Sequence, residues 1–138
     1  MTVTTMPPTN ARAAAGRARY VTDTVETVSP GRLVTMLYDA LVRDLVLAEE
    51  SLGERPDLHT ANDRLVHAQA IVLELQTGLD PTKWEGGPGL DRLYGFLHGE
   101  LVRANVEKDA VRVASCRLLV EPLRQAWHEA ADALAKSA

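Results

Sequence analysis

The sequence predicts an all-α protein, an antiparallel up-down four-helix bundle with a flexible N-terminal arm. Three observations favour this fold class. The apolar fraction is 46% and is dominated by Leu, Val and Ala, whereas aromatic residues make up only 4%; this composition is typical of helices packed on helices. Apolar residues recur at intervals of three and four in separate segments. The connections between these segments are short, so consecutive helices should be antiparallel neighbours.

Residues 1–19 are predicted to form the flexible arm, and residues 20–138 to form a single bundle domain. The arm is rich in threonine, and its charged residues are all basic in an otherwise acidic protein. Two interpretations stay open. The arm is a solubilising tail, or it folds Tyr20 and Val25 over an apolar site and moves aside when a partner binds.

The first helix begins at Ser29 and Pro30 and ends near Gly53. A serine hydroxyl caps a helix by accepting from an unpaired backbone N–H, and proline suits the first helical position. The segment that follows is apolar around most of its circumference, whereas a surface helix normally has a single apolar stripe. This helix must therefore be surrounded by its own protein or offer surface to another chain.

Two further helices follow, each with its own start and stop signals. Asp57 or Thr60 can cap the second helix, and Gly78 ends it. The third begins near Pro88, after a loop rich in glycine and proline, and ends at Asn105. The third helix contains Gly95 and Gly99, which we expect to permit close packing of a neighbouring helix; the alternative is a groove for a partner segment.

The fourth helix is capped by Asp109 and is expected to kink or break at Pro122, because proline removes one backbone hydrogen bond. Its apolar residues at helical spacing are predicted to face the bundle. These are Val111, Ala114, Leu118, Leu123, Ala126, Trp127, Ala130 and Leu134.

Composition argues against several functional classes. The net charge of −4 speaks against a nucleic-acid partner. No apolar run approaches the length of a membrane span, no signal peptide is evident, and Cys116 is the only cysteine. These features favour a cytoplasmic protein with no disulfide and no membrane insertion. The histidines form no metal-ligand motif, so we expect no metal, no cofactor and no catalytic residues.

Several short motifs follow one another along the chain. In chain order they are Tyr20; Ser29-Pro30, Leu33 and Met36-Leu37-Tyr38-Asp39; Ala68, Ile71-Val72 and Glu74-Leu75; Leu93-Tyr94, Leu101, Ala104-Asn105 and Asp109; and Leu123-Arg124 with Ala126-Trp127. This ordered set resembles the FliS family of flagellar export chaperones. The chain departs from the family pattern at Gly95, where an acidic residue is expected, and at Pro122.

The resemblance implies a non-enzymatic cytoplasmic chaperone. Such a protein binds the disordered C-terminal segment of flagellin, prevents its premature polymerisation and, once loaded, presents it to a component of the export gate. The alternative is a generic helical-bundle adaptor for another secretion or regulatory protein. A homodimer is an assembly that the sequence leaves open.

The residues expected to contact flagellin combine the apolar face of the first helix with a few positions elsewhere. They are Tyr20, Leu33, Met36, Leu37, Tyr38, Leu41, Tyr94, Leu97 and Trp127. Core packing is the competing interpretation for each of them. Tyr38 in particular is expected at the boundary of the core, with its ring buried and its hydroxyl hydrogen-bonded.

Overall fold

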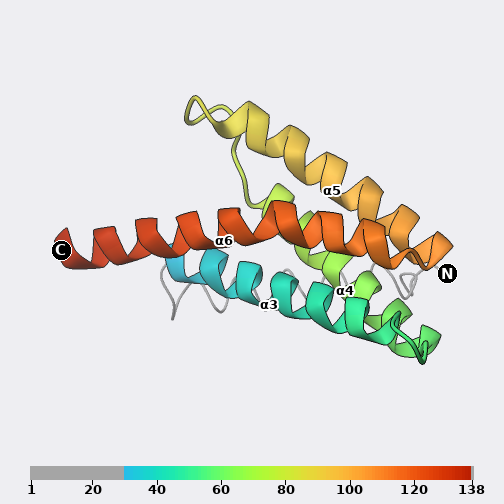
Figure 1. Ribbon diagram of the computed structural model, residues 1–138. Coiled ribbons are helices and arrows are strands. Elements are labelled where there is room, and N and C mark those ends of the chain that lie inside the picture. The colour runs from blue at the N-terminus through green and yellow to red at the C-terminus, as the bar shows by residue number, and fades with distance from the viewer. Residues whose placement is uncertain (1–29, 138) are drawn as a thin grey trace, which may run out of the picture. The chain divides into compact units, whose positions relative to one another are not determined.

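The computed structural model describes residues 30–137, which form four α-helices joined by short connections (Figure 1). The helices are α3 (Pro30–Ser51), α4 (Leu58–Thr77), α5 (Gly87–Glu107) and α6 (Ala110–Ser137). The described residues from Val34 onward belong to one compact unit. The prediction of an all-α four-helix bundle is confirmed. The arm predicted over residues 1–19, and Tyr20 with it, lies outside the described residues.

Helix α3 makes side-chain contacts with all three other helices. Its Tyr38 hydroxyl lies 2.8 Å from the Tyr94 hydroxyl of α5. Its Asp44 pairs with Arg64 of α4 at 3.3 Å, and its Glu49 pairs with Arg117 of α6. The apolar residues around α3 are thus covered mainly by the other helices of the same chain.

The core is one cluster of buried apolar residues contributed by all four helices. Its members are Tyr38, Leu41, Leu45, Ala48, Leu65, Ala68, Ile71, Val72, Leu75, Tyr94, Leu97, Leu101, Ala104, Val113, Cys116 and Val120. On α4 and α5 these positions keep the helical spacing read from the sequence. The bundle interior is therefore set by the apolar stripes of the helices.

The helix boundaries follow local capping chemistry. Asp57 caps α4, because its Oδ1 accepts from the Thr60 backbone N–H at 3.1 Å. Asp109 caps α6 in the same way, accepting from the Arg112 N–H at 3.1 Å. Helix α5 extends to Glu107, two residues beyond the predicted end, and Lys108 then takes the left-handed conformation with φ 51°. Both aspartate caps were expected from the sequence, the first as one of two candidates.

Helix α6 runs unbroken through Pro122, so the predicted break is wrong. Figure 1 shows the helix without a sharp bend. Pro122 is exposed, and so is Leu118, whose carbonyl oxygen loses its usual N–H partner one turn earlier. Since that carbonyl belongs to the exposed side of the helix, water can satisfy it.

The prediction of which α6 residues face the core is also wrong in part. The buried positions are Val113, Cys116 and Val120. Several residues that were assigned to the core are exposed instead: Val111, Leu118, Ala126, Ala130 and Leu134. The first half of α6 is apolar on more than one face, so helical spacing alone fits two orientations of the helix.

Gly95 and Gly99 do not serve close helix packing, so that expectation is corrected. A Cβ atom at Gly99 would meet nothing within 4 Å, and one at Gly95 would meet only the Gln76 amide nitrogen, at 3.7 Å. Both glycines are exposed, on the side of α5 away from the core. No neighbouring helix within the described residues requires them to be small.

Gly99→Ala is therefore expected to raise the free energy of unfolding by about 0.5–1 kcal/mol, because alanine restricts the unfolded chain and favours the helix. Urea denaturation at low protein concentration measures this change. Gly87→Ala is the matched control. It should destabilise, because its Cβ would clash with the Pro81 carbonyl oxygen. A loss of stability in Gly99→Ala would contradict the finding that a Cβ at this position meets open space.

Candidate functional site

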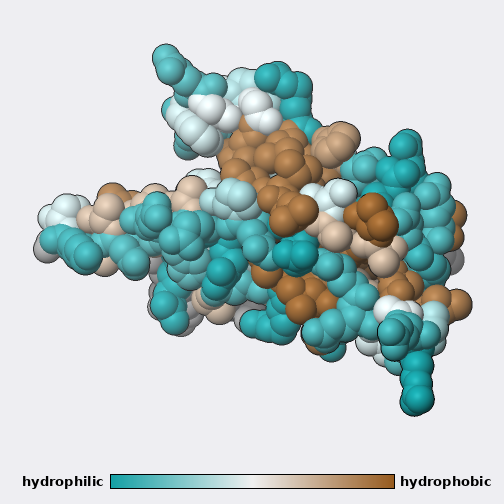
Figure 2. Space-filling view, in the orientation of Figure 1, coloured by the Kyte–Doolittle hydropathy of each residue, from teal (hydrophilic) through white to brown (hydrophobic). Residues whose placement is uncertain are grey.

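An exposed apolar surface lies between α5 and α6. Figure 2 shows apolar side chains gathered in the space between these two helices and continuing onto α6. Helix α5 contributes Leu90, Leu93 and Phe96, and α6 contributes Leu119 and Leu123. We call these residues the α5/α6 surface. Phe96 is 55% exposed and Leu119 is 43% exposed, so each helix presents a large apolar side chain to solvent.

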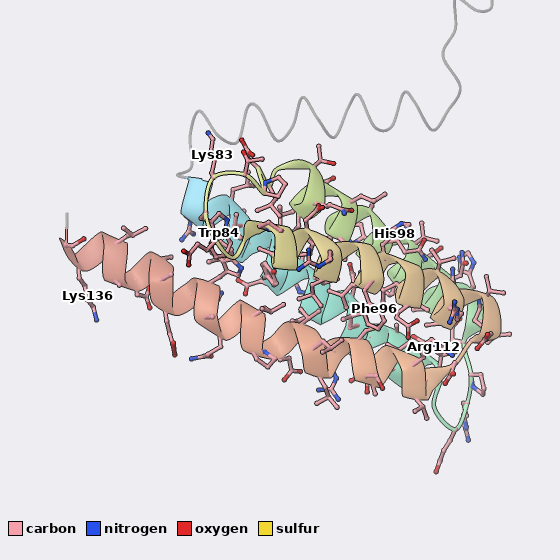
Figure 3. The ribbon with its side chains drawn as sticks, turned by 90° about the horizontal axis from the view of Figure 1, so that it is seen from above. Lys83, Trp84, Phe96, His98, Arg112 and Lys136 are labelled. Atoms are coloured by element: carbon pink, nitrogen blue, oxygen red, sulfur yellow. The ribbon has the colours of Figure 1, made fainter. Side chains whose placement is uncertain are left out.

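The geometry of the two helices creates this surface. They are tied near their connection, where Arg112 donates to Glu100 at 2.8 Å, and they diverge toward the Gly87 end of α5 (Figure 1). Residues three or four apart share a helix face, which aligns Leu93 with Phe96 and Leu119 with Leu123. In Figure 3, Phe96 lies on the α6 side of α5 and His98 on the α4 side. The apolar side chains therefore line the opening.

The floor of this surface is firmly packed. Leu90, Leu93 and Leu123 are half-buried and contact the core cluster, as does Trp127 further along α6. The Trp127 ring lies 6.4 Å from the Tyr38 ring, measured between centroids. A partner would thus meet a preformed surface, and little ordering of the protein itself would oppose binding.

Beneath this floor lies a buried pair of tyrosines. Burial raises the pKa of both Tyr38 and Tyr94, whose hydroxyls are hydrogen-bonded to each other. The expectation that the Tyr38 ring is buried and its hydroxyl partnered is confirmed, although the residue lies inside the core and not at its boundary. This pair joins α3 to α5.

The structure places the predicted contact residues at different depths. Four of them are buried with exposed fractions of 0–2%, namely Tyr38, Leu41, Tyr94 and Leu97. Three are half-buried, namely Leu33, Leu37 and Trp127. Met36 is 40% exposed and is the one exposed large apolar residue among those described on α3. Tyr20 lies outside the described part of the chain.

Phe96 and Leu119 were not singled out from the sequence. The sequence does contain an indication of their exposure, and it is the one that drew attention to α3. Each lies on a helix with more large apolar residues than one core-facing stripe needs. Phe96 is also the single phenylalanine of the chain. The surplus on α3 is largely buried, whereas the surplus on α5 and α6 reaches the surface.

Asp39 ties α3 to the same half of α6 that carries Trp127. It accepts from Arg124 Nε at 2.6 Å and is hydrogen-bonded to His128 Nε2 at 2.8 Å. Partial burial alone would raise the pKa of Asp39, but the hydrogen bonds and charges of His128 and Arg124 outweigh it, and the pKa lies below the ordinary value of 3.8. The ionised carboxylate is therefore the form that the fold favours.

Asp39→Asn is expected to lower the stability at pH 7 by less than about 1 kcal/mol, since the group is partly exposed and screened by solvent. Because the folded-state pKa is depressed, this contribution is present above pH 3.8 and is lost as the pH falls through the lower folded-state value. Urea denaturation of both proteins between pH 7 and pH 2.5 measures the difference. A difference independent of pH would contradict this assignment.

Metal binding, nucleophilic catalysis by a thiol and membrane spanning have no support in the described residues. Across residues 30–137, no group of three or more His, Cys, Asp or Glu side chains is arranged to hold a metal ion. Burial raises the pKa of the Cys116 thiol to about 11, so the thiolate that a nucleophile requires is suppressed. None of the described helices is long and apolar enough to cross a membrane.

Comparison with known proteins decides the family. Residues 12–134 match the family model described as flagellar protein FliS. The chain belongs to the FliS family. Two relatives named flagellar secretion chaperone FliS are each 31% identical over 111 residues. With the relative from Bacillus subtilis (strain 168), the matched region covers 80% of this chain and 82% of the relative. With the relative from Salmonella typhimurium (strain LT2), it covers 79% of this chain and 82% of the relative.

This membership establishes the general role. FliS proteins are flagellar secretion chaperones, so the chain is a flagellar export chaperone and not an enzyme. An export chaperone needs a surface that recognises its client. In the described part of this FliS protein, the α5/α6 surface is the clearest set of exposed apolar side chains resting on a packed floor.

Proposed function

We propose that this FliS protein acts in the cytoplasm, where it binds the disordered C-terminal segment of flagellin. Binding prevents premature polymerisation, and the loaded chaperone is then recognised by a component of the export gate. The observation that carries the proposal is the α5/α6 surface, because an unpartnered apolar surface on a folded domain is typical of a protein-binding site.

The client segment would dock as amphipathic helices. A helix satisfies its backbone hydrogen bonds internally, so it can lay an apolar face on the α5/α6 surface without stranding polar groups. Ordering a disordered segment costs on the order of 2–5 kcal/mol. Two or three buried anchors, each worth about 2 kcal/mol, offset that cost. Phe96 and Leu119 are the proposed anchors.

The residues predicted from the sequence divide into two groups in this proposal. Met36 contacts the client directly, since its flexible thioether chain adapts to different side chains, and half-buried Leu33, Leu37 and Trp127 add to the contact area. The buried residues act from beneath by holding the helices in place. They are Tyr38, Leu41, Tyr94 and Leu97.

Titration calorimetry with the full chain and a synthetic C-terminal flagellin segment tests the proposal. We expect binding with a large negative heat-capacity change, because apolar surface is buried and the segment folds. An unrelated amphipathic peptide of equal length and charge is the control. Failure of the folded protein to bind the flagellin segment would refute the proposal. Equal binding of both peptides would favour the generic helical-bundle adaptor instead.

A further inference from the structure

Helix α6 is tied to α3 at several points along its length. Arg117 of α6 pairs with Glu49 of α3. Two turns further along α6, Arg124 donates from Nε to Asp39 Oδ1 at 2.6 Å. His128 is hydrogen-bonded to the same oxygen at 2.8 Å. These contacts make α3 and α6 one pair within the bundle.

Helix α5 is tied to α4 in the same manner. Asn105 Nδ2 donates to Asn62 Oδ1 at 2.9 Å. Toward the other end of α5, Gln76 Nε2 donates to Asp91 Oδ1 at 3.2 Å. The bundle is thus built from two pairs of helices, and the α5/α6 surface lies where one pair meets the other.

One side chain ties the two pairs together at this surface. Arg112 of α6 donates from Nη1 to Glu100 Oε1 of α5 at 2.8 Å, and its Nη2 lies 3.8 Å from a carboxylate oxygen of Glu107, the last residue of α5. Within residues 30–137, the hydrogen bonds and ion pairs between side chains of α5 and α6 are all made by Arg112. Figure 3 shows Arg112 close to the connected ends of the two helices and Phe96 further from them.

The guanidinium of Arg112 favours the contact with α5 over a contact nearer in the chain. Its Nε lies 3.7 Å from Asp109 Oδ2, and this Nε is buried without a hydrogen-bond partner among the described residues. A buried donor without an acceptor is rare in native proteins. Because the guanidinium is a rigid fork, turning Nε toward Asp109 would break the 2.8 Å hydrogen bond to Glu100. The fold therefore keeps the tie between the helices and leaves Nε unpaired.

We propose that Arg112 is a positioning residue for client binding, a role that rests on the proposed function. It holds α5 and α6 at the separation at which the α5/α6 surface receives the flagellin segment. Arg112 lies near the connected ends, eleven residues from the level of Gly89 on α5 and fourteen from Ala126 on α6. Those distances are about 16 Å and about 21 Å along the helices, so a small change of angle at the tie becomes a larger displacement at the open end. A surface held in place binds without a further ordering cost.

Arg112→Met is expected to open the α5/α6 surface, because it leaves the carboxylates of Glu100, Glu107 and Asp109 together without the cation between them. Affinity for the flagellin segment should fall about twofold to thirtyfold, the range for residues that act on a binding site without touching its ligand. Glu100→Gln should weaken binding in the same direction. The double variant should lose no more affinity than Arg112→Met alone, because both substitutions break the same contact.

Double electron–electron resonance on the full chain measures the separation of the two helices without any client. Spin labels on Gly89→Cys and Ala126→Cys lie across the opening, since each position is exposed and shares a helix face with a member of the α5/α6 surface one turn away. Cys116 is buried and burial raises the pKa of its thiol to about 11, so the introduced cysteines are labelled in preference. Arg112→Met should lengthen and broaden the distribution of label distances. Titration calorimetry on the unlabelled variants measures affinity for the flagellin segment.

Arg117→Met is the matched control. The two arginines lie on the same helix with similar side-chain exposure, 25% for Arg117 and 28% for Arg112. Each pairs with a glutamate of another helix, but the partner of Arg117 is on α3 and not across the α5/α6 surface. Arg117→Met should therefore lower the stability while leaving the label distance and the flagellin affinity unchanged.

Two results would overturn the role of Arg112 in holding the opening: an unchanged label distance in Arg112→Met, or an equal change in Arg117→Met. A changed distance with unchanged affinity would overturn its link to the client. If the flagellin segment fails to bind the wild type, the proposed function fails, and the label distances still decide whether Arg112 holds the two helices. Circular dichroism establishes that each variant remains helical.

Discussion

Tyr38→Ala should lower the free energy of unfolding by about 3–5 kcal/mol, because it removes a fully buried aromatic side chain. Part of the loss comes from the Tyr94 hydroxyl, which the substitution leaves buried without its partner 2.8 Å away. Since a domain of this size is stable by only about 5–15 kcal/mol, a large share of the variant will be unfolded under mild stress. Thermal and urea denaturation measure the effect.

Tyr38→Phe is the matched control for this prediction. It keeps the ring and removes the hydroxyl, so the loss should be about 1–2 kcal/mol. If Tyr38→Ala cost no more than Tyr38→Phe, the ring would not be part of the core. The comparison also bears on function, because weaker flagellin binding by Tyr38→Ala would reflect a damaged fold and not a lost contact.

Phe96→Ala combined with Leu119→Ala should weaken binding of the flagellin segment by about 30-fold to 1,000-fold, as expected for the loss of one or two buried anchors. The free protein should lose little stability, because both side chains are substantially exposed. Titration calorimetry measures the affinity, and urea denaturation checks the fold.

Val106→Ala provides the control for the double variant. Val106 also lies on α5 and is 78% exposed, but it is not part of the α5/α6 surface. Its truncation should leave flagellin binding unchanged. Equal losses of affinity in both variants would show that the client does not distinguish the α5/α6 surface from other exposed apolar residues of α5, and would contradict the assignment of Phe96 and Leu119 as anchors.

The fold could be predicted from local chemistry, because capping residues and apolar stripes act over a few residues. Asp57 and Asp109 are aspartates just ahead of apolar periodic segments, and both cap helices as such residues commonly do. The stripe on α4 is also unambiguous. On α6 the apolar residues cover more than one face, and only packing against α3 and α5 decides that Cys116 and Val120 are buried.

The contact surface was harder to predict for a related reason. The sequence shows that α3 has a surplus of apolar residues, but it does not show that three other helices cover it. Tyr38 belongs to the motif that opens the first helix, Leu41 follows it within one helical turn, and both are in the core. Phe96 and Leu119 lie outside the motifs, and their exposure follows from the divergence of α5 from α6. That divergence is a property of tertiary packing.

The short connections of the bundle also affect how quickly the chaperone becomes available. They span residues 52–57, 78–86 and 108–109, so each helix packs on one that is close in sequence. Helical proteins dominated by such local contacts fold within microseconds to milliseconds. Synthesis proceeds at about 5–20 residues per second, so making this chain takes on the order of 10 s. The supply of active chaperone is therefore set by its translation, and each new molecule is ready almost as soon as it leaves the ribosome.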